Sequence, residues 1–497
     1  MMQETTYNLI LKTYNGCLTL FRILKIMLSN MRAGRIIARS LIGFFIGLFI
    51  SGGSNAQGIS VEENYARNAP GIAMVQAVYS ATVYANKVAV NEPTFNRLVD
   101  SVKRLDHGGG LSGEQKLDIV IRELYANPIR YFSPTTEYYT QQHRVLSNGT
   151  GFFITGEGHL ITNCHVIERD SAFIRRKFLL STFQEVTDAN INALESAWQM
   201  TLSEEQRNLL YDVYSFVYSR MSPLVLNNLR KELNVLYRID NGDEHMARIK
   251  KPAEVLIKGK AMPGKDVAIL KINDVRNLPV LRISNSTQPR IGSRVLVLGF
   301  PEPAGNNVFL ALDAATEPTL TSGVVSAVKK SVGGWPVIQM DALIAHGSSG
   351  SPVCDEKGDV IGLATFGSLE QRTGTLASGF NFAIPLPVIQ EFIDSVKVKP
   401  RVSHASQVFN QGLQFFYQSY YRKALSKFKE VLNINGNYPG VHLLITECEK
   451  RMAAGGDRQS FIEKNFFRII AFALVIGGVY IIYRQRRQLR LSKEMPS

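Results

Sequence analysis

A turn of small residues in the second half of the chain combines residue types that could carry out acyl transfer. Residues 347–352 read Gly-Ser-Ser-Gly-Ser-Pro, and the apolar runs 352–354 and 360–366 follow them. A serine in such a turn can attack a carbonyl carbon if its neighbours are small and backbone N–H groups point at the developing oxyanion. Gly347 and Ser349 would supply those two N–H groups. Alternatively the segment is only a turn, because Gly/Ser turns are common.

A nucleophilic serine needs a base, and the base needs a carboxylate that orients it. Upstream of the turn the chain offers both. The second of two apolar runs, 149–154 and 160–166, contains His165 near its end, and Asp266 opens the apolar run 266–272. Each residue also has a plain structural interpretation, as a solvated histidine at a strand end and an aspartate that caps a turn. The occurrence of all three features favours a catalytic set.

Three segments then carry a family resemblance. In chain order they are GTGFFITGEGHLITNCHV, DVAILKI and GSSGSP, and they resemble the trypsin-like peptidase domain of the HtrA (Deg) family of serine proteases. The resemblance implies a mainly β, chymotrypsin-like fold, in which two six-stranded antiparallel barrels meet at the active site. It also implies that His165 is the general base, Asp266 its orienting residue and Ser349 the nucleophile. The N–H groups of Gly347 and Ser349 would form the oxyanion hole.

The same resemblance predicts the substrate pocket. In chymotrypsin-like folds the residue six before the nucleophile lies at the base of the pocket, and here that residue is Leu343. Leu343, Ile344 and Ala345 offer no carboxylate, so we expect the pocket to accept small or medium aliphatic side chains and to reject Lys and Arg. The family usually has Asn and Gly where this chain has Ser348 and Ser351, which bears on the close packing behind the nucleophile.

Composition indicates a globular protein with basic ends. The 497 residues are 45% apolar and carry a net charge of +14, which allows a full core. Residues 1–56 hold six Lys or Arg against one Glu, and residues 484–497 hold five against one. This distribution favours membrane targeting over nucleic-acid binding.

Both ends of the chain resemble targeting segments. Basic residues precede the apolar run 41–50, and small residues follow up to Ala56, so we expect residues 1–56 to be a leader and signal peptide. Met31 is an alternative start, and a mitochondrial presequence is an alternative leader. An apolar run with arginines directly after it predicts a transmembrane helix over 466–483 and a basic cytoplasmic tail over 484–497, although a buried core helix is the alternative.

Between these ends we expect two parts. Residues 57–396 would form the peptidase domain, with helical insertions near 92–142 and 180–235 that contain capping boxes at Ser112 and Ser203. The aromatic stripe around Tyr214 would be the core of a helical subdomain or a substrate-gripping surface. Residues 404–455 match the spacing of one tetratricopeptide repeat, with a plain helical hairpin as the alternative.

The cysteines do not indicate a disulfide framework. Beyond Cys17 in the leader, Cys164, Cys354 and Cys448 are an odd number and lie far apart. We expect them to act as small buried hydrophobes; alternatively, Cys164 and Cys354 could oxidise near the site.

The sequence therefore predicts a membrane-anchored, extracytoplasmic serine endopeptidase that acts on polypeptides in quality control or regulated proteolysis, without metal or organic cofactor. The helical repeat could bind a protein partner, and the resemblance makes a homo-oligomer conceivable. A catalytically silent barrel that serves as a scaffold is the alternative.

Overall fold

A computed structural model describes residues 58–106, 109–242, 246–285, 289–302, 317–369 and 376–458, with isolated positions between 470 and 486. The chain divides into two compact units, Met1–Gly58 and Ile59–Ser497. The predicted leader and signal peptide lie outside the described residues, as do most of the predicted transmembrane span and tail. Within the described part of the chain, no helix is long and apolar enough to cross a membrane.

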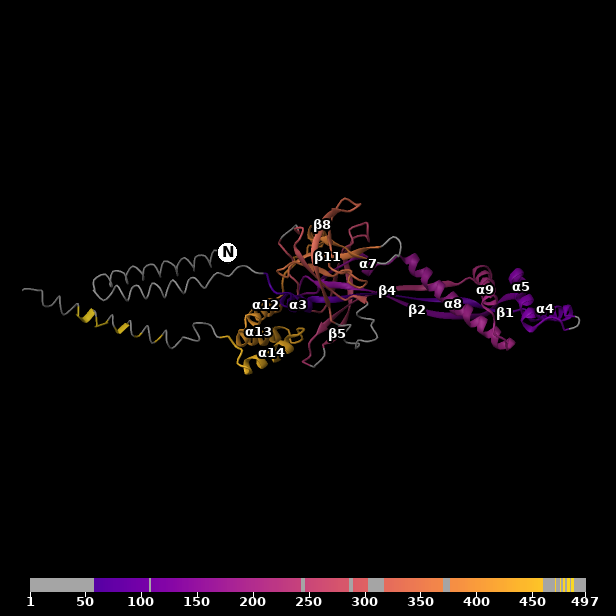
Figure 1. The fold of residues 1–497 in the computed structure, drawn as a ribbon, viewed down its shortest axis with the longest axis horizontal. Coiled ribbons are helices and arrows are strands. Elements are labelled where there is room, and N and C mark those ends of the chain that lie inside the picture. The colour runs from indigo at the N-terminus through magenta and orange to yellow at the C-terminus, as the bar shows by residue number, and fades with distance from the viewer. Residues whose placement is uncertain are drawn as a thin grey trace, which may run out of the picture. The chain divides into compact units, whose positions relative to one another are not determined.

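Six strands of the first half form a closed antiparallel barrel in the order β1-β2-β3-β6-β5-β4 (Figure 1). Apolar side chains alternate along the barrel part of these strands, as expected for strands with one buried face. The strands are β1 (Ile72–Val90), β2 (Phe132–Phe153), β3 (His159–Thr162), β4 (Val225–Ile239), β5 (Ala247–Lys258) and β6 (Ala268–Ile272).

A second closed barrel follows in the order β10-β11-β12-β9-β8-β7. One apolar cluster joins the two barrels, with Phe152 and Ile269 from the first and Leu296 and Leu363 from the second. The prediction of two six-stranded barrels is therefore confirmed. The strands are β7 (Arg294–Gly299), β8 (Thr319–Lys330), β9 (Pro336–Met340), β10 (Pro352–Cys354), β11 (Val360–Leu369) and β12 (Leu376–Pro385).

Strands β1, β2 and β4 continue beyond the barrel and carry the helical insertions (Figure 1). The capping boxes predicted at Ser112 and Ser203 are present. The buried rings of Tyr214 and Tyr218 belong to the apolar core of this region, which confirms their prediction as core residues. The helices are α4 (Glu92–Leu105), α5 (Gly113–Ala126), α6 (Pro128–Tyr131), α8 (Ser171–Trp198) and α9 (Glu204–Phe216), followed by a π-helical turn (Val217–Met221).

Two sequence predictions about these insertions are wrong. Residues 225–235 are strand rather than helix, because β4 pairs with β1 along its length and this pairing overrides local helical periodicity. Residues 132–142, expected within the first helical insertion, are also strand, because β2 begins at Phe132 and pairs with β1.

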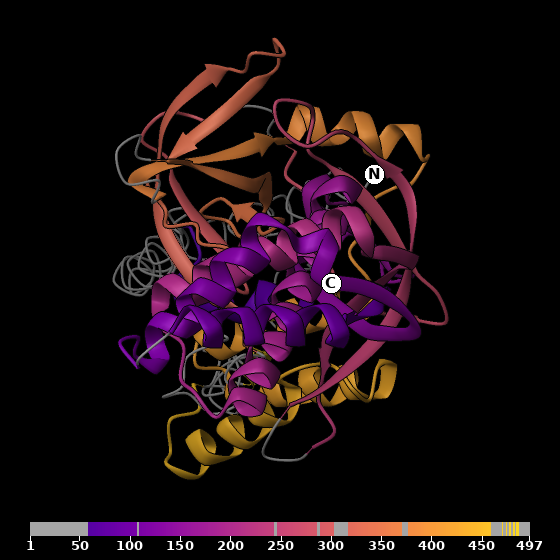
Figure 2. The same cartoon turned by 90° about the vertical axis from the view of Figure 1, so that its right-hand side faces the viewer.

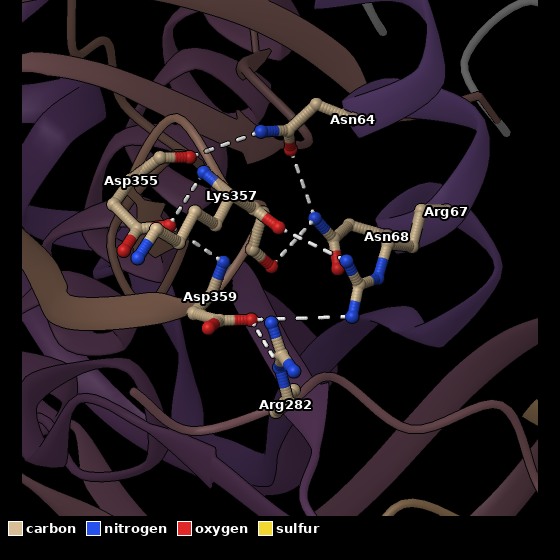
Figure 3. A network of polar contacts seen from close by, with 8 residues as sticks. Asn64, Arg67, Asn68, Arg282, Asp355, Lys357 and Asp359 are labelled. Carbon is tan, nitrogen blue, oxygen red and sulfur yellow. Dashed lines mark hydrogen bonds and ion pairs between the residues drawn. The ribbon is translucent and has the colours of Figure 1, made fainter. Parts of the chain in front are cut away.

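A short N-terminal helix, α3 (Val61–Asn68), binds the turn between β10 and β11. The Asn64 side chain donates to the carbonyl oxygen of Asp355 at 3.0 Å, and the Asn68 side chain donates to that of Gly358 at 3.1 Å (Figure 3). Below them Asp359 accepts a 2.5 Å bond from Arg282. These contacts fix the hairpin that directly follows the candidate nucleophile.

Three C-terminal helices pack side by side (Figures 1 and 2). Gly412 faces the ring of Phe428, and a Cβ at residue 412 would lie 2.6 Å from that ring. The group is bound to the first-barrel region: the Asp240 carboxylate contacts His442 Nδ1 at 2.9 Å, and Ser403 Oγ donates to the Leu278 carbonyl oxygen at 2.8 Å. The three helices are α12 (His404–Tyr417), α13 (Tyr421–Ile434) and α14 (Val441–Ala453). A separate helix, α11 (Leu386–Ser395), precedes them and directly follows the last barrel strand.

Candidate active site

The histidine and the aspartate predicted from the sequence are in direct contact. His165 lies on the short helix α7 (Cys164–Ile167), and Asp266 precedes β6. His165 Nδ1 lies 2.5 Å from Asp266 Oδ2, and the His165 backbone N–H donates to Asp266 Oδ1 at 2.9 Å. Asp266 is fully buried. A buried carboxylate that accepts two such bonds holds the imidazole with its other nitrogen free to act as a base.

Two further side chains position Asp266. The Thr365 hydroxyl donates to Asp266 Oδ2 at 2.9 Å, and the Asn163 side-chain amide donates to the Asp266 carbonyl oxygen at 2.7 Å. Thr365 and Asn163 are buried. The carboxylate of Asp266 is therefore fixed from β11, and its backbone is fixed from the segment that leads into α7.

Ser349 lines the same cavity as His165 and Asp266. Its hydroxyl donates to the carbonyl oxygen of Thr365 at 3.1 Å, and no hydrogen bond joins it to His165 within the described residues. Thr365 thus contacts the orienting carboxylate with its hydroxyl and the candidate nucleophile with its carbonyl. Rotation of the serine side chain away from Thr365 is needed before His165 can accept its proton, and apo sites often tighten in this way on substrate binding.

The loop around Ser349 requires glycine at two positions. Gly347 and Gly350 both have φ of +88°, which L-residues with a Cβ rarely adopt. A Cβ at Gly350 would lie 1.9 Å from the Thr150 carbonyl oxygen, and one at Gly347 would lie 2.3 Å from that of Phe300. The backbone N–H groups of Gly347 and Ser349 make no hydrogen bond with any described residue, so both remain available to an oxyanion.

Thr150 holds this loop in place. Its hydroxyl donates to the Gly347 carbonyl oxygen at 2.8 Å and accepts from the Phe300 N–H at 3.0 Å. Its backbone N–H donates to the Ser349 carbonyl oxygen at 2.8 Å. Thr150 is fully buried and connects the first barrel to both residues of the predicted oxyanion hole.

Gly299 accommodates the side chain of Ser351, at the position where the resembling HtrA family usually has glycine. Ser351 is fully buried, and its hydroxyl has no hydrogen-bond partner among the described residues. The hydroxyl occupies the space beside Gly299, where a Cβ would lie 2.0 Å from Ser351 Oγ. The packing behind the nucleophile therefore depends on the absence of a side chain at residue 299.

The predicted pocket residues separate into two groups. Ile344 and Ala345 line the cavity of about 920 Å³ that contains Ser349. Leu343 does not line it and is 60% exposed, whereas its neighbours Ala342 and Ile344 are buried. The structure thus brings two of the three predicted pocket residues to the wall of this cavity.

The three described cysteines are free and buried, which confirms their prediction as small buried residues. Burial and the Asp266 charge raise the pKa of Cys164. Burial also raises the pKa of Cys354, and it raises the pKa of Cys448 to about 12. Burial and the raised pKa values favour the protonated thiol over the reactive thiolate at these three residues.

Comparison with known proteins supports the protease-like character of this region. Residues 225–363 match the family profile described as "Trypsin-like peptidase domain". The matched stretch includes Asp266 and Ser349, whereas His165 precedes it.

Curated relatives are similar over part of their length. A "Probable periplasmic serine endoprotease DegP-like" from Pseudomonas savastanoi pv. phaseolicola is 31% identical over 169 residues, which is 33% of this chain and 32% of that protein. "Serine endoprotease DegS" from Escherichia coli is 30% identical over 135 residues, or 26% of this chain and 35% of that protein. The chain thus spans about a third of the length of the curated relatives that it matches.

Solved structures of HtrA-type proteases also align with part of this chain. "HtrA-type protease AlgW with decapeptide" aligns with a TM-score of 0.33 and 19% identity, over 68% of each chain. "Crystal structure of the serine endoprotease from Yersinia pestis" aligns with a TM-score of 0.32 and 17% identity, over 68% of this chain and 66% of that one.

Proposed function

We propose that this protein is a serine endopeptidase that hydrolyses polypeptides through an acyl-enzyme. The observation that carries the proposal is the contact of His165 with the buried Asp266 in the cavity that also contains Ser349. The N–H groups of Gly347 and Ser349, which bond to no other residue that the structure describes, supply the second requirement, donors for a developing oxyanion.

In the proposed reaction Ser349 Oγ attacks the scissile carbonyl while His165 accepts its proton. The carbon–nitrogen bond then breaks, His165 gives that proton to the leaving amine, and the ester of Ser349 remains. A water molecule activated by His165 hydrolyses the ester and restores the serine. Asp266 keeps the imidazole in the required tautomer and stabilises the imidazolium.

Cleavage of an unfolded protein tests this function. The purified full-length chain should digest reduced casein, and the Ser349→Ala variant should lose about 10³-fold or more of that activity. Ser348→Ala is the matched control, because the Ser348 hydroxyl contacts only the N–H of Ala345 and has no proposed chemical role. Equal loss in both variants would show that the nucleophile is misassigned. Retention in Ser349→Ala would refute the mechanism.

A substrate preference follows from the cavity wall. Ile344 and Ala345 supply apolar surface beside Ser349, so we propose that the residue before the scissile bond is a small or medium aliphatic one. Predominant cleavage after Lys or Arg in the casein digest would contradict this assignment.

The cellular setting is also part of the proposal. The name of one relative above describes a probable periplasmic endoprotease, and the basic, apolar ends of this chain suit a signal peptide and a membrane anchor. We place the peptidase domain outside the cytoplasm, with a role in quality control or regulated proteolysis and with α12 to α14 as a tetratricopeptide-like partner site. Protease added to intact spheroplasts should digest the barrels and spare a tag after Ser497; the opposite pattern would invert this topology.

The alternative function is a catalytically silent scaffold. Ser349 donates to Thr365 rather than to His165, which is the observation that favours it. A scaffold would bind unfolded protein without cleaving it, and the casein experiment separates the two functions.

A further inference from the structure

The cavity around Ser349 has an apolar wall that the proposed chemistry does not use. Leu146 of β2 and Phe173 of α8 both line it. They are 50% and 54% exposed, respectively. Large apolar side chains that remain exposed inside a concave site indicate contact with a ligand.

The segment that presents Phe173 is fixed to the barrel strands. The Arg169 N–H donates to the Tyr79 hydroxyl, and Arg169 Nε donates to Ser147 Oγ, each at 2.9 Å. Asp170 then caps α8 by accepting from the N–H of Ala172 at 2.9 Å. Since Ser147 adjoins Leu146, these bonds connect the two segments that carry the apolar pair.

Helix α8 is also held by its buried face. Ile174 and Phe178, one turn apart, pack against β1 in a cluster that includes Tyr79 and Val83. Phe173 lies off this face, and α8 begins close to α7 and runs out along the extended strands (Figure 1). The position of Phe173 beside the cavity is therefore set by a rigid element rather than by a loop.

We propose that Leu146 and Phe173 form a subsite for a large apolar side chain of the substrate, on the leaving-group side of the scissile bond. This inference rests on the proposed function. Residues 169–173 follow α7, which carries His165, and His165 is the group that would protonate the leaving amine. The wall on the His165 side thus faces the part of the substrate after the bond, whereas Ile344 and Ala345 come from the second barrel.

A peptide series tests the subsite. The peptides share one scissile bond and carry Leu or Ser at each of the three positions after it. At one position the wild-type chain should prefer Leu about tenfold or more in kcat/KM, the range expected for an apolar pocket. Phe173→Ser and Leu146→Ser should each bring that ratio close to one. Because the ratio compares two peptides on the same protein, a general loss of activity does not produce this result.

Leu180 provides a matched control. It lies on the same helix, seven residues after Phe173, and is equally exposed at 54%, but does not line the cavity. Leu180→Ser should keep the wild-type preference. A wild-type ratio near one at all three positions, or a ratio that neither cavity substitution changes, would overturn the subsite.

A binding experiment separates failure of the subsite from failure of the proposed function. In the Ser349→Ala background, fluorescence anisotropy should show the Leu peptide binding about tenfold more tightly than the Ser peptide, with the difference removed by Phe173→Ser. If the wild type cleaves no peptide and this difference is still found, the endopeptidase function fails and the subsite stands as a peptide-binding groove. If the wild type cleaves the peptides, but Phe173→Ser changes neither the kcat/KM ratio nor the difference in binding affinity, only the subsite fails.

Discussion

The side-chain hydroxyl of Thr150 donates a 2.8 Å hydrogen bond to the backbone carbonyl oxygen of Gly347. A residue of the first barrel thereby determines the orientation of a loop in the second, at the position whose N–H is proposed to stabilise the oxyanion. Alignment of the two barrels and alignment of the oxyanion hole are thus coupled through one buried threonine.

Replacing Thr150 should affect catalysis more than substrate binding. Thr150→Val keeps the shape but removes the bonds to Gly347 and Phe300. We expect kcat to fall about tenfold or more with little change in KM, because loss of an oxyanion donor costs about 10²- to 10³-fold. Thr150→Ser retains the hydroxyl and should restore most of kcat. An equal loss in the two variants, or a loss confined to KM, would show that Thr150 does not act through the loop.

Asp266 should be essential for activity but not for folding. In Asp266→Asn the side-chain oxygen can still accept from the backbone N–H of His165. The side-chain NH₂ group then faces His165 Nδ1 and favours the wrong imidazole tautomer, so we expect kcat to fall about 10⁴-fold. Thr365→Val removes only the bond to Asp266 Oδ2 and should have a smaller effect. Kinetics on one peptide, with thermal melting as the control for folding, checks both. Near-normal activity in Asp266→Asn would contradict the proposed triad.

The sequence contained the architecture and the main site residues, but not the residues that position them. His165, Asp266 and Ser349 stood in recognisable apolar contexts, and the barrels could be predicted from them. Thr150 and Thr365 were missed because their roles depend on contacts between strands far apart in the chain. The one sequence signal for these two threonines was that each is a small polar residue inside an apolar run near the site. The exposure of Leu343 beside the buried Ala342 and Ile344 could not be predicted, because it depends on packing between segments far apart in the chain.

Helical periodicity also led to a wrong prediction of secondary structure. Residues 225–235 were expected to be helical, but their pairing with β1 determines the outcome. The subsite residue Phe173 was missed for a related reason, because nothing in the local sequence shows that α8 begins beside the cavity.

Gly299 and Ser351 should be coupled in stability. Gly299→Ala places a methyl group on Ser351 Oγ, and such overpacking costs about 1–3 kcal/mol. Adding Ser351→Gly should recover part of this loss. Ser351→Ala alone should be neutral or stabilising, since the buried hydroxyl has no partner among the described residues. Thermal melting of the wild type, Gly299→Ala, Ser351→Gly and the variant that combines these two substitutions gives the coupling, and strictly additive effects would contradict the contact.

The buried thiols should be inert in the folded protein. Their raised pKa values keep Cys164, Cys354 and Cys448 protonated at pH 8, and the thiolate is the reactive form. Iodoacetamide should therefore modify these residues only after urea is added, as followed by peptide mass spectrometry. Rapid modification of Cys164 in the native protein would contradict both its burial and the raised pKa.

The most direct test of the account is the position of a covalent adduct. A fluorophosphonate reacts with a serine that is activated by a base and faces an oxyanion hole. Incubated with the full-length chain, it should form one adduct, mapped by mass spectrometry to Ser349, that is absent in Ser349→Ala and greatly slowed in His165→Ala. The absence of an adduct on the folded wild type, or an adduct on Ser348 or Ser351 instead, would contradict the claim that Ser349 is the nucleophile.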